Sequence, residues 1–136
     1  MYKGGCLCDG IRFEISDEIR HIVFCHCSQC RKVQGSAFAT NGVVARDRFT
    51  IVKGRELMTA YESSPGKVKY FCRRCGSPIY SDNAQQPEVV RIRLGTIESD
   101  IKERPECHIF VGSKANWARI TDDLPQYDEY PVKPAR

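Results

Sequence analysis

Seven of the eight cysteines in this 136-residue chain fall into three short groups whose spacing suits metal binding. The groups are Cys6-Leu7-Cys8, Cys25-His26-Cys27-Ser28-Gln29-Cys30 and Cys72-Arg73-Arg74-Cys75-Gly76. Two cysteines separated by one or two residues bring two thiolates to one tetrahedral ion, and soft sulfur ligands favour zinc over hard cations. The spacing therefore predicts two zinc sites.

Seven thiolates divide most naturally into one site of four ligands and one site of three. A four-cysteine zinc site is closed and structural, whereas a three-cysteine site leaves one coordination position for water or a substrate. This asymmetry is the main reason to expect an enzyme. The closed site is assigned to the first and third groups, that is to Cys6, Cys8, Cys72 and Cys75.

A zinc ion in the closed site would link the first β-hairpin to the middle of the sheet. Such a link is worth on the order of 10 kcal/mol of folding free energy in small zinc-binding peptides. Gly76 directly follows the last cysteine and suits a tight turn with positive φ. The open site is assigned to Cys25, Cys27 and Cys30, whose sulfurs converge if the segment turns from the end of a strand into a short helix.

The fourth ligand of the open site is not decided by the spacing: water, a substrate thiol, Cys107 or His108 can complete it. Alternation along a strand would turn only one of Cys107 and His108 toward the metal, and a buried inert thiol is the preferred interpretation of Cys107. His26 lies between two ligands and is expected to point away from them. Zinc with three thiolates is a weak Lewis acid, better suited to holding a substrate thiol for attack on a small aldehyde than to generating hydroxide.

Size and composition predict one domain spanning residues 1–136, with enough hydrophobic residues (41%) for one core. The apolar stretches are short and no charged-then-apolar leader opens the chain, so we expect a cytoplasmic protein with no membrane partner. Without a leader, paired cysteines favour metal ligation over disulfides. The formal charge of +4 falls to about +1 with seven thiolates and two zinc ions, which argues against a nucleic-acid partner.

Short β-rich runs predict a mostly β, largely antiparallel fold. They span residues 11–15, 38–44, 49–53, 57–62, 68–71, 89–94 and 107–111. Turn signals such as Asp9-Gly10 and Asn41-Gly42 accompany them. Short helical turns are expected at 27–33 and 113–117, and the proline-containing tail, 121–136, is expected to lack regular structure.

The cysteine groups with their neighbours, and several residues near the C-terminus, resemble the glutathione-dependent formaldehyde-activating family, also called Gfa-like or centromere protein V-like. The matching motifs are Gly4-Gly5-Cys6-x-Cys8, Cys25-His26-Cys27-x-x-Cys30-Arg31, Phe71-Cys72-x-x-Cys75-Gly76-Ser77, His108-Ile109-Phe110-Val111, Trp117 and Asp122-Asp123-Leu124-Pro125. The likeness runs from about residue 3 to residue 131.

This resemblance implies a β-tent fold with a structural zinc and a second, catalytic zinc on the same two cysteine sets. The three-ligand zinc is expected to be the more labile one, because it has fewer protein ligands. The namesake enzyme condenses formaldehyde with glutathione to S-(hydroxymethyl)glutathione, which is a carbon–sulfur lyase reaction written in reverse. The expected partners are thus a small thiol such as glutathione and a small aldehyde. The glutathione thiolate would lie at or near the open zinc and add to the aldehyde carbon.

Two other functions are weighed against this one. A non-catalytic, zinc-stapled binding module would have two closed metal sites, and a methionine sulfoxide reductase relative would need a lone nucleophilic cysteine, for which only Cys107 is available. Phe110 and Trp117 can wall a pocket, although a core role is preferred for Trp117. Candidate holders of substrate carboxylates, each more readily explained as a surface charge, are Arg31, Lys32, Arg73, Lys114 and Arg119.

Overall fold

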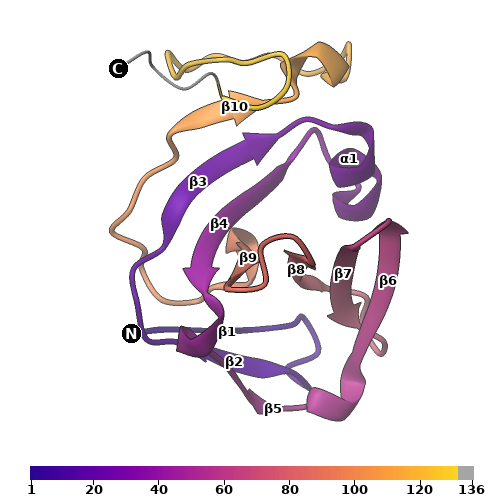
Figure 1. Cartoon of the computed structure of the whole chain (residues 1–136), viewed down its shortest axis with the longest axis vertical. Helices are drawn as coiled ribbons and strands as arrows, with labels where there is room; N and C mark the ends of the chain where they lie inside the picture. The colour runs from indigo at the N-terminus through magenta and orange to yellow at the C-terminus, as the bar shows by residue number, and fades with distance from the viewer. Residues whose placement is uncertain (132–136) are drawn as a thin grey trace.

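The computed structural model describes residues 1–131, which form two β-sheets and one α-helix. The smaller sheet is antiparallel, with strand order β1-β2-β5. Its strands are β1 (Tyr2–Gly5), β2 (Arg12–Ile15) and β5 (Phe49–Lys53). Figure 1 shows this sheet at the base of a larger, strongly curved one.

The larger sheet has seven strands in the order β10-β3-β4-β9-β8-β7-β6. They are β3 (Arg20–Cys25), β4 (Ala39–Ala45), β6 (Met58–Ser64), β7 (Lys67–Cys72), β8 (Pro78–Asn83), β9 (Val89–Arg93) and β10 (Cys107–Ile109). Neighbouring strands are antiparallel except β10, which runs parallel to β3. The helix α1 (Ser28–Gln34) follows β3, and four 3₁₀ turns complete the described elements: η1 (Arg46–Arg48), η2 (Arg55–Leu57), η3 (Leu94–Thr96) and η4 (Val111–Ser113).

The mostly β prediction is confirmed, and every predicted strand overlaps an observed one. The sequence pattern missed three strands. β1 contains paired glycines, β3 begins with a charged residue, and β8 ends with polar residues. The Asn41-Gly42 turn signal was wrong, because both residues lie inside β4. A β-carbon at Gly42 would come within 2.4 Å of the Ile19 side chain, so glycine is required there for close packing rather than for a turn.

Alternation along the strands separates a core face from a polar face. On β2, Phe13 and Ile15 are buried between the sheets, and on β9 Val90 and Ile92 are fully buried in the same core. The side chains between those on β9 therefore face the other side of the larger sheet. Hydrophobic burial thus leaves a second face of this sheet available for a site.

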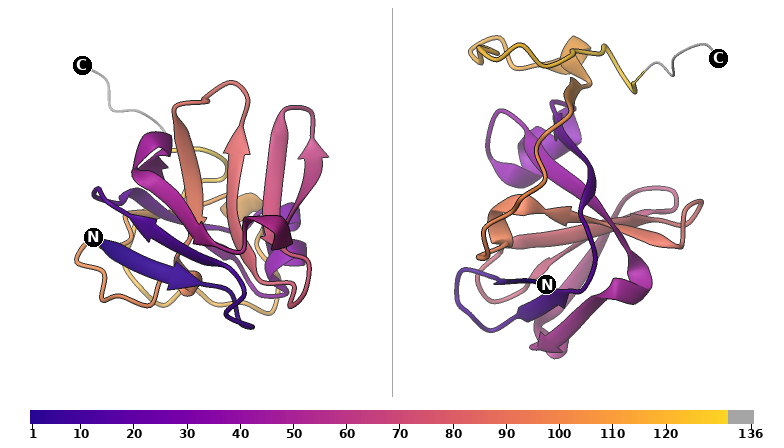
Figure 2. Two further views of the ribbon diagram at one scale, coloured as in Figure 1. Left: turned by 90° about the horizontal axis from the view of Figure 1, so that it is seen from below. Right: turned by 90° about the vertical axis from the view of Figure 1, so that its left-hand side faces the viewer.

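The C-terminal segment after β10 lies along one end of the molecule, as the right-hand view of Figure 2 shows. It is fastened to β10 through His108, whose N–H donates to Pro125 O (2.9 Å) and whose carbonyl accepts from Tyr127 N–H (3.0 Å). The predicted absence of regular structure is confirmed for 121–131, and the rest of the predicted tail, 132–136, lies outside the described residues. The predicted helical turn at 113–117 was misplaced, because the 3₁₀ turn η4 spans 111–113 and no helix covers 114–117. The described helices include none with the length and hydropathy needed to span a bilayer.

Candidate metal centres and the adjoining cavity

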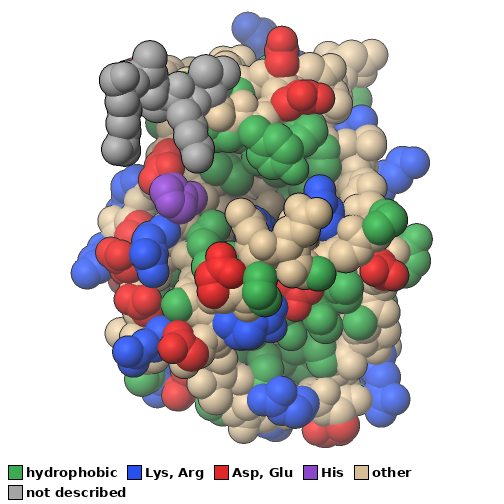
Figure 3. Space-filling view, viewed as in Figure 1, with side chains coloured by type: hydrophobic (Ala, Val, Ile, Leu, Met, Phe, Trp, Pro, Cys, Tyr) green, Lys and Arg blue, Asp and Glu red, His purple; other side chains and the backbone are tan. Residues whose placement is uncertain are grey.

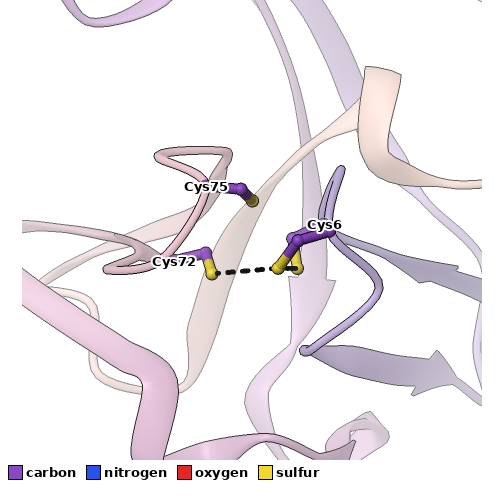
Figure 4. Close-up of side chains that lie close together, drawn as sticks. Cys6, Cys72 and Cys75 are labelled. Atoms are coloured by element: carbon purple, nitrogen blue, oxygen red, sulfur yellow. Dashed lines mark hydrogen bonds between the residues drawn. The ribbon is translucent and has the colours of Figure 1, made fainter.

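The first and third cysteine groups meet between the two sheets. Cys6 and Cys8 lie in the turn after β1, whereas Cys72 ends β7 and Cys75 lies in the following turn. Figure 4 shows the sulfurs of Cys6, Cys72 and Cys75 directed toward one another. All four sulfurs lie within 4.8 Å of one another, with 3.5 Å between Cys6 and Cys8 and 3.8 Å between Cys8 and Cys72. Four sulfurs around zinc at 2.3 Å would be about 3.8 Å apart, so this cluster fits a tetrahedral zinc ion.

Backbone and side-chain donors surround these sulfurs. Ile11 N–H donates to Cys6 Sγ (3.2 Å) and Arg74 Nε donates to Cys8 Sγ (3.3 Å). The pKa of Cys8 is lowered by the N–H of Gly10 and by Arg74. Gly76 has the expected positive φ, +80°, and its N–H closes the turn onto Cys72 O (2.8 Å). These contacts stabilise thiolates, the form in which cysteine binds metal.

The middle cysteine group forms a second cluster at the junction of β3 and α1. Cys25 ends β3, Cys27 is the N-cap of α1 and accepts from Cys30 N–H (3.3 Å), and Cys30 lies in the first turn of the helix. The three sulfurs lie within 4.8 Å of one another. The short helix predicted at 27–33 is confirmed as α1, and the strand end that the convergence required is that of β3. The converging sulfurs fit a three-thiolate zinc site.

Hydrogen bonds within this cluster shift the pKa values of its cysteines in opposite directions. The pKa of Cys27 is lowered to about 2, mainly by its hydrogen bonds with Cys25 and Cys30. The pKa of Cys25 is raised, first by its hydrogen bond with Cys27 and then by Cys30 and by burial. Hydrogen bonds from its two neighbours thus favour the thiolate form at Cys27, which is half-buried.

No further His, Cys, Asp or Glu between residues 1 and 131 joins this cluster as a fourth ligand. Cys107 is buried on the same side of β10 as Ile109, which pairs with Cys25, but its sulfur is not among the clustered ligand atoms. His108 faces the opposite side. Neither residue closes the site, and all eight cysteines are free of disulfides.

The two buried histidines near the cluster instead form a hydrogen-bonded chain that ends on the exposed Asp122. His26 Nε2 lies 2.8 Å from His108 Nδ1, and His108 Nε2 lies 2.9 Å from Asp122 Oδ2. The hydrogen bond from His108 lowers the pKa of Asp122, so the carboxylate accepts from His108 Nε2–H. In a neutral His108, Nδ1 is then the acceptor, and His26 Nε2–H donates to it. The backbone N–H of His26 also donates to the backbone carbonyl of Ile109 (3.0 Å). The sequence interpretation expected His26 to point away from the ligands and weighed His108 only as a ligand. It did not predict this hydrogen-bonded chain, which fixes the segment between Cys25 and Cys27.

A cavity of about 390 Å³ adjoins the three-cysteine cluster, within the range typical of small-molecule sites. Its walls include the three cysteines, Phe110 and the polar face of β7, β8 and β9. Figure 3 shows this side of the molecule hollowed near its centre, below a group of hydrophobic side chains. The cluster is thus next to a space that a substrate can occupy.

The cations of this cavity are not those considered from the sequence. Its basic lining residues are Lys67, Lys69, Arg91 and Arg93, and none of the five candidate carboxylate holders is among them. The preferred core role of Trp117 was wrong, because its side chain is 68% exposed. Only the strand register could have singled out the four basic residues, and the register depends on β8, which the sequence pattern did not predict.

Comparison with known proteins gives consistent results. The family model described as glutathione-dependent formaldehyde-activating enzyme matches residues 1–113. A Halomonas elongata protein named for glutathione-dependent formaldehyde activation is 32% identical over 130 residues, covering 88% of this chain and 81% of that protein. A Schizosaccharomyces pombe protein described as an uncharacterized lyase is 27% identical. The match covers 80% of this chain and 85% of that protein.

Among solved structures, the crystal structure of a Rhodobacter sphaeroides protein is similar with a TM-score of 0.60 and 24% identity. The match covers 76% of this chain and 97% of that one, which supports the fold. The family match extends over most of the chain and includes all seven clustered cysteines. The chain therefore belongs to the glutathione-dependent formaldehyde-activating enzyme family.

Proposed function

We propose that this protein is a zinc-dependent enzyme that joins a small thiol to a small aldehyde. The observation that carries the proposal is the three-cysteine cluster beside a cavity, with no fourth protein ligand among the described residues. The four-cysteine cluster is proposed as a structural zinc site, with Cys25, Cys27 and Cys30 holding a catalytic, labile zinc. Zinc held by these three thiolates would favour the thiolate form of a substrate thiol at its remaining position.

Glutathione and formaldehyde are the proposed substrates, because the names of the family and of the Halomonas relative specify them. The thiolate sulfur would form a bond to the aldehyde carbon, the carbon–oxygen π bond would break, and the oxygen would take up a proton. The product is S-(hydroxymethyl)glutathione, so the enzyme is a carbon–sulfur lyase acting in reverse. The lyase description of the Schizosaccharomyces relative supports this reaction class.

The protein's own residues would position the reactants. The histidine chain from Asp122 to His26 holds the cluster segment in place, and Phe110 contributes an apolar wall to the cavity. We also propose that residues 1–136 form a single Gfa-like domain, with its core at about 3–131, that works in the cytoplasm without a membrane or nucleic-acid partner.

The test combines adduct formation with metal content. The rate of exchange between ¹³C-formaldehyde and its glutathione adduct is measured by NMR with zinc-loaded wild type and with Cys27→Ser. We expect the wild type, but not Cys27→Ser, to accelerate exchange above the spontaneous rate. We also expect the wild type to bind about two zinc ions per chain, of which glutathione perturbs only one. Two zinc ions indifferent to glutathione, with no acceleration, would instead support the zinc-stapled binding module.

A further inference from the structure

Four cations line one face of the cavity, and strand pairing explains why they meet. Lys69 pairs with Ser81 on β8, and Ser81 pairs with Arg91 on β9, so these side chains form a row across three strands. Lys67 and Arg93 lie two residues from Lys69 and Arg91 on their strands and so project from the same face. We call Lys67, Lys69, Arg91 and Arg93 the cationic face.

The two arginines have hydrogen-bond donors that no protein group satisfies. Arg93 is only 4% exposed, and its Nε has no hydrogen-bond partner. Arg91 Nη1 is likewise buried and unpaired, although Nη2 contacts the Gln86 side chain. Asn41, which pairs with Arg93 across the strands and also lines the cavity, has an unpaired Oδ1. Buried polar atoms normally have partners, so these orphaned groups indicate a missing polar ligand.

The charge of the cationic face is not neutralised by nearby carboxylates. Within residues 1–131, none of its four members forms an ion pair with an acidic side chain. Asp82 lines the same cavity, but its carboxylate accepts from Arg46 (2.9 Å) and from Tyr70 (3.3 Å). Zinc with three thiolates carries a net charge of −1, which one cation balances. Positive charge therefore remains for a ligand.

We propose that the cationic face binds the carboxylates of the thiol substrate and selects an anionic peptide thiol over a neutral thiol. This inference rests on the proposed function. β8 lies between β7 and β9, so the cations of these two strands are two strand spacings, about 9.5 Å, apart. Two carboxylates of one ligand can therefore each contact the cations of one strand. Arginine suits this role because its planar fork binds carboxylates through two hydrogen bonds. The free Asn41 Oδ1 can accept from an ammonium or amide group, which such a peptide also carries.

The experiment measures binding of S-methylglutathione, whose blocked sulfur cannot form a thiolate, to the zinc-loaded protein by calorimetry. We expect Lys69→Gln and Arg93→Gln each to weaken binding about 10-fold or more, because a hydrogen bond to a charged group is lost. Lys102→Gln removes the same charge from an exposed residue that does not line the cavity, and should leave the affinity unchanged. Lys69 is only half-buried, so its variant remains informative if Arg93→Gln does not fold.

Two further ligands identify what the cationic face recognises. S-methylglutathione diethyl ester, which lacks both carboxylates, should bind at least 10-fold more weakly and should not respond to Lys69→Gln. Glutarate, a dicarboxylate without the peptide, should also bind more weakly than S-methylglutathione. Equal binding of the ester, equal binding of glutarate, no binding of S-methylglutathione or no effect of the variants would each overturn the proposal. Charge-dependent binding without acceleration of formaldehyde exchange would support the cationic face while rejecting the proposed reaction.

Discussion

The two cysteine clusters use the same ligand type in opposite surroundings. The four-cysteine cluster belongs to the main hydrophobic core, where Cys72 is fully buried and packs among residues of both sheets. The three-cysteine cluster belongs to a separate small core under the C-terminal segment and opens on the cavity. The position of a thiolate cluster in the fold therefore decides whether the cluster links structural elements or remains accessible to a substrate.

Removing a ligand from the core cluster should have the largest effect on the molecule. Cys72→Ser would weaken the only proposed metal link between the sheets, and structural zinc contributes on the order of 10 kcal/mol in small domains. That is comparable to the whole stability of a typical domain, about 5 to 15 kcal/mol. We expect the variant to lose its cooperative thermal transition in circular dichroism. A variant that unfolds cooperatively near the wild-type temperature would contradict a structural role for this cluster.

The equivalent change in the open cluster should separate function from folding. Cys27→Ser removes one of three ligands from a site that the main core does not depend on. We expect a cooperative unfolding transition close to that of the wild type, a zinc content that falls from about two to about one per chain, and no acceleration of formaldehyde exchange. Elemental analysis and thermal melts on the same samples provide the measurement. Unfolding as severe as that of Cys72→Ser would remove the contrast between the clusters.

A smaller effect is expected from the histidine chain, which supports only the open cluster. Asp122→Ala leaves His108 Nε2 without its acceptor and loosens the segment that His26 anchors. Hydrogen-bond partners of metal ligands change metal affinity by about 10- to 100-fold, and we expect this more distant support to act at the lower end of that range. We expect one zinc ion to pass to a chelator about 10-fold faster, while the other zinc is unaffected.

The matched control for this prediction is Asp123→Ala. This change removes the neighbouring exposed carboxylate, which takes no part in the hydrogen bonds between Asp122, His108 and His26. Its zinc should be released at the wild-type rate. Equal release rates for the two variants would show that the hydrogen-bond chain does not stabilise the open cluster.

The sequence predicted the clusters better than their surroundings, for a physical reason. Short cysteine spacings constrain the metal geometry locally, so Cys25, Cys27 and Cys30 could be grouped without knowing the fold. The cationic face depends on pairing among β7, β8 and β9, and polar β8 lacks the apolar alternation that marks a strand. The link between His26 and His108 joins residues 82 positions apart through the parallel β10–β3 pair, which no local pattern specifies.

The smallest effect is expected at Cys107, the one cysteine outside both clusters. Its thiol is buried beside the open cluster, and burial raises its pKa, which disfavours the thiolate needed for metal binding. Cys107→Ala should therefore leave zinc content and exchange activity unchanged, with a loss of unfolding free energy of about 1 kcal/mol from the small void. Loss of one zinc ion would instead show that Cys107 moves to complete the cluster, making both centres closed and favouring a binding module over an enzyme.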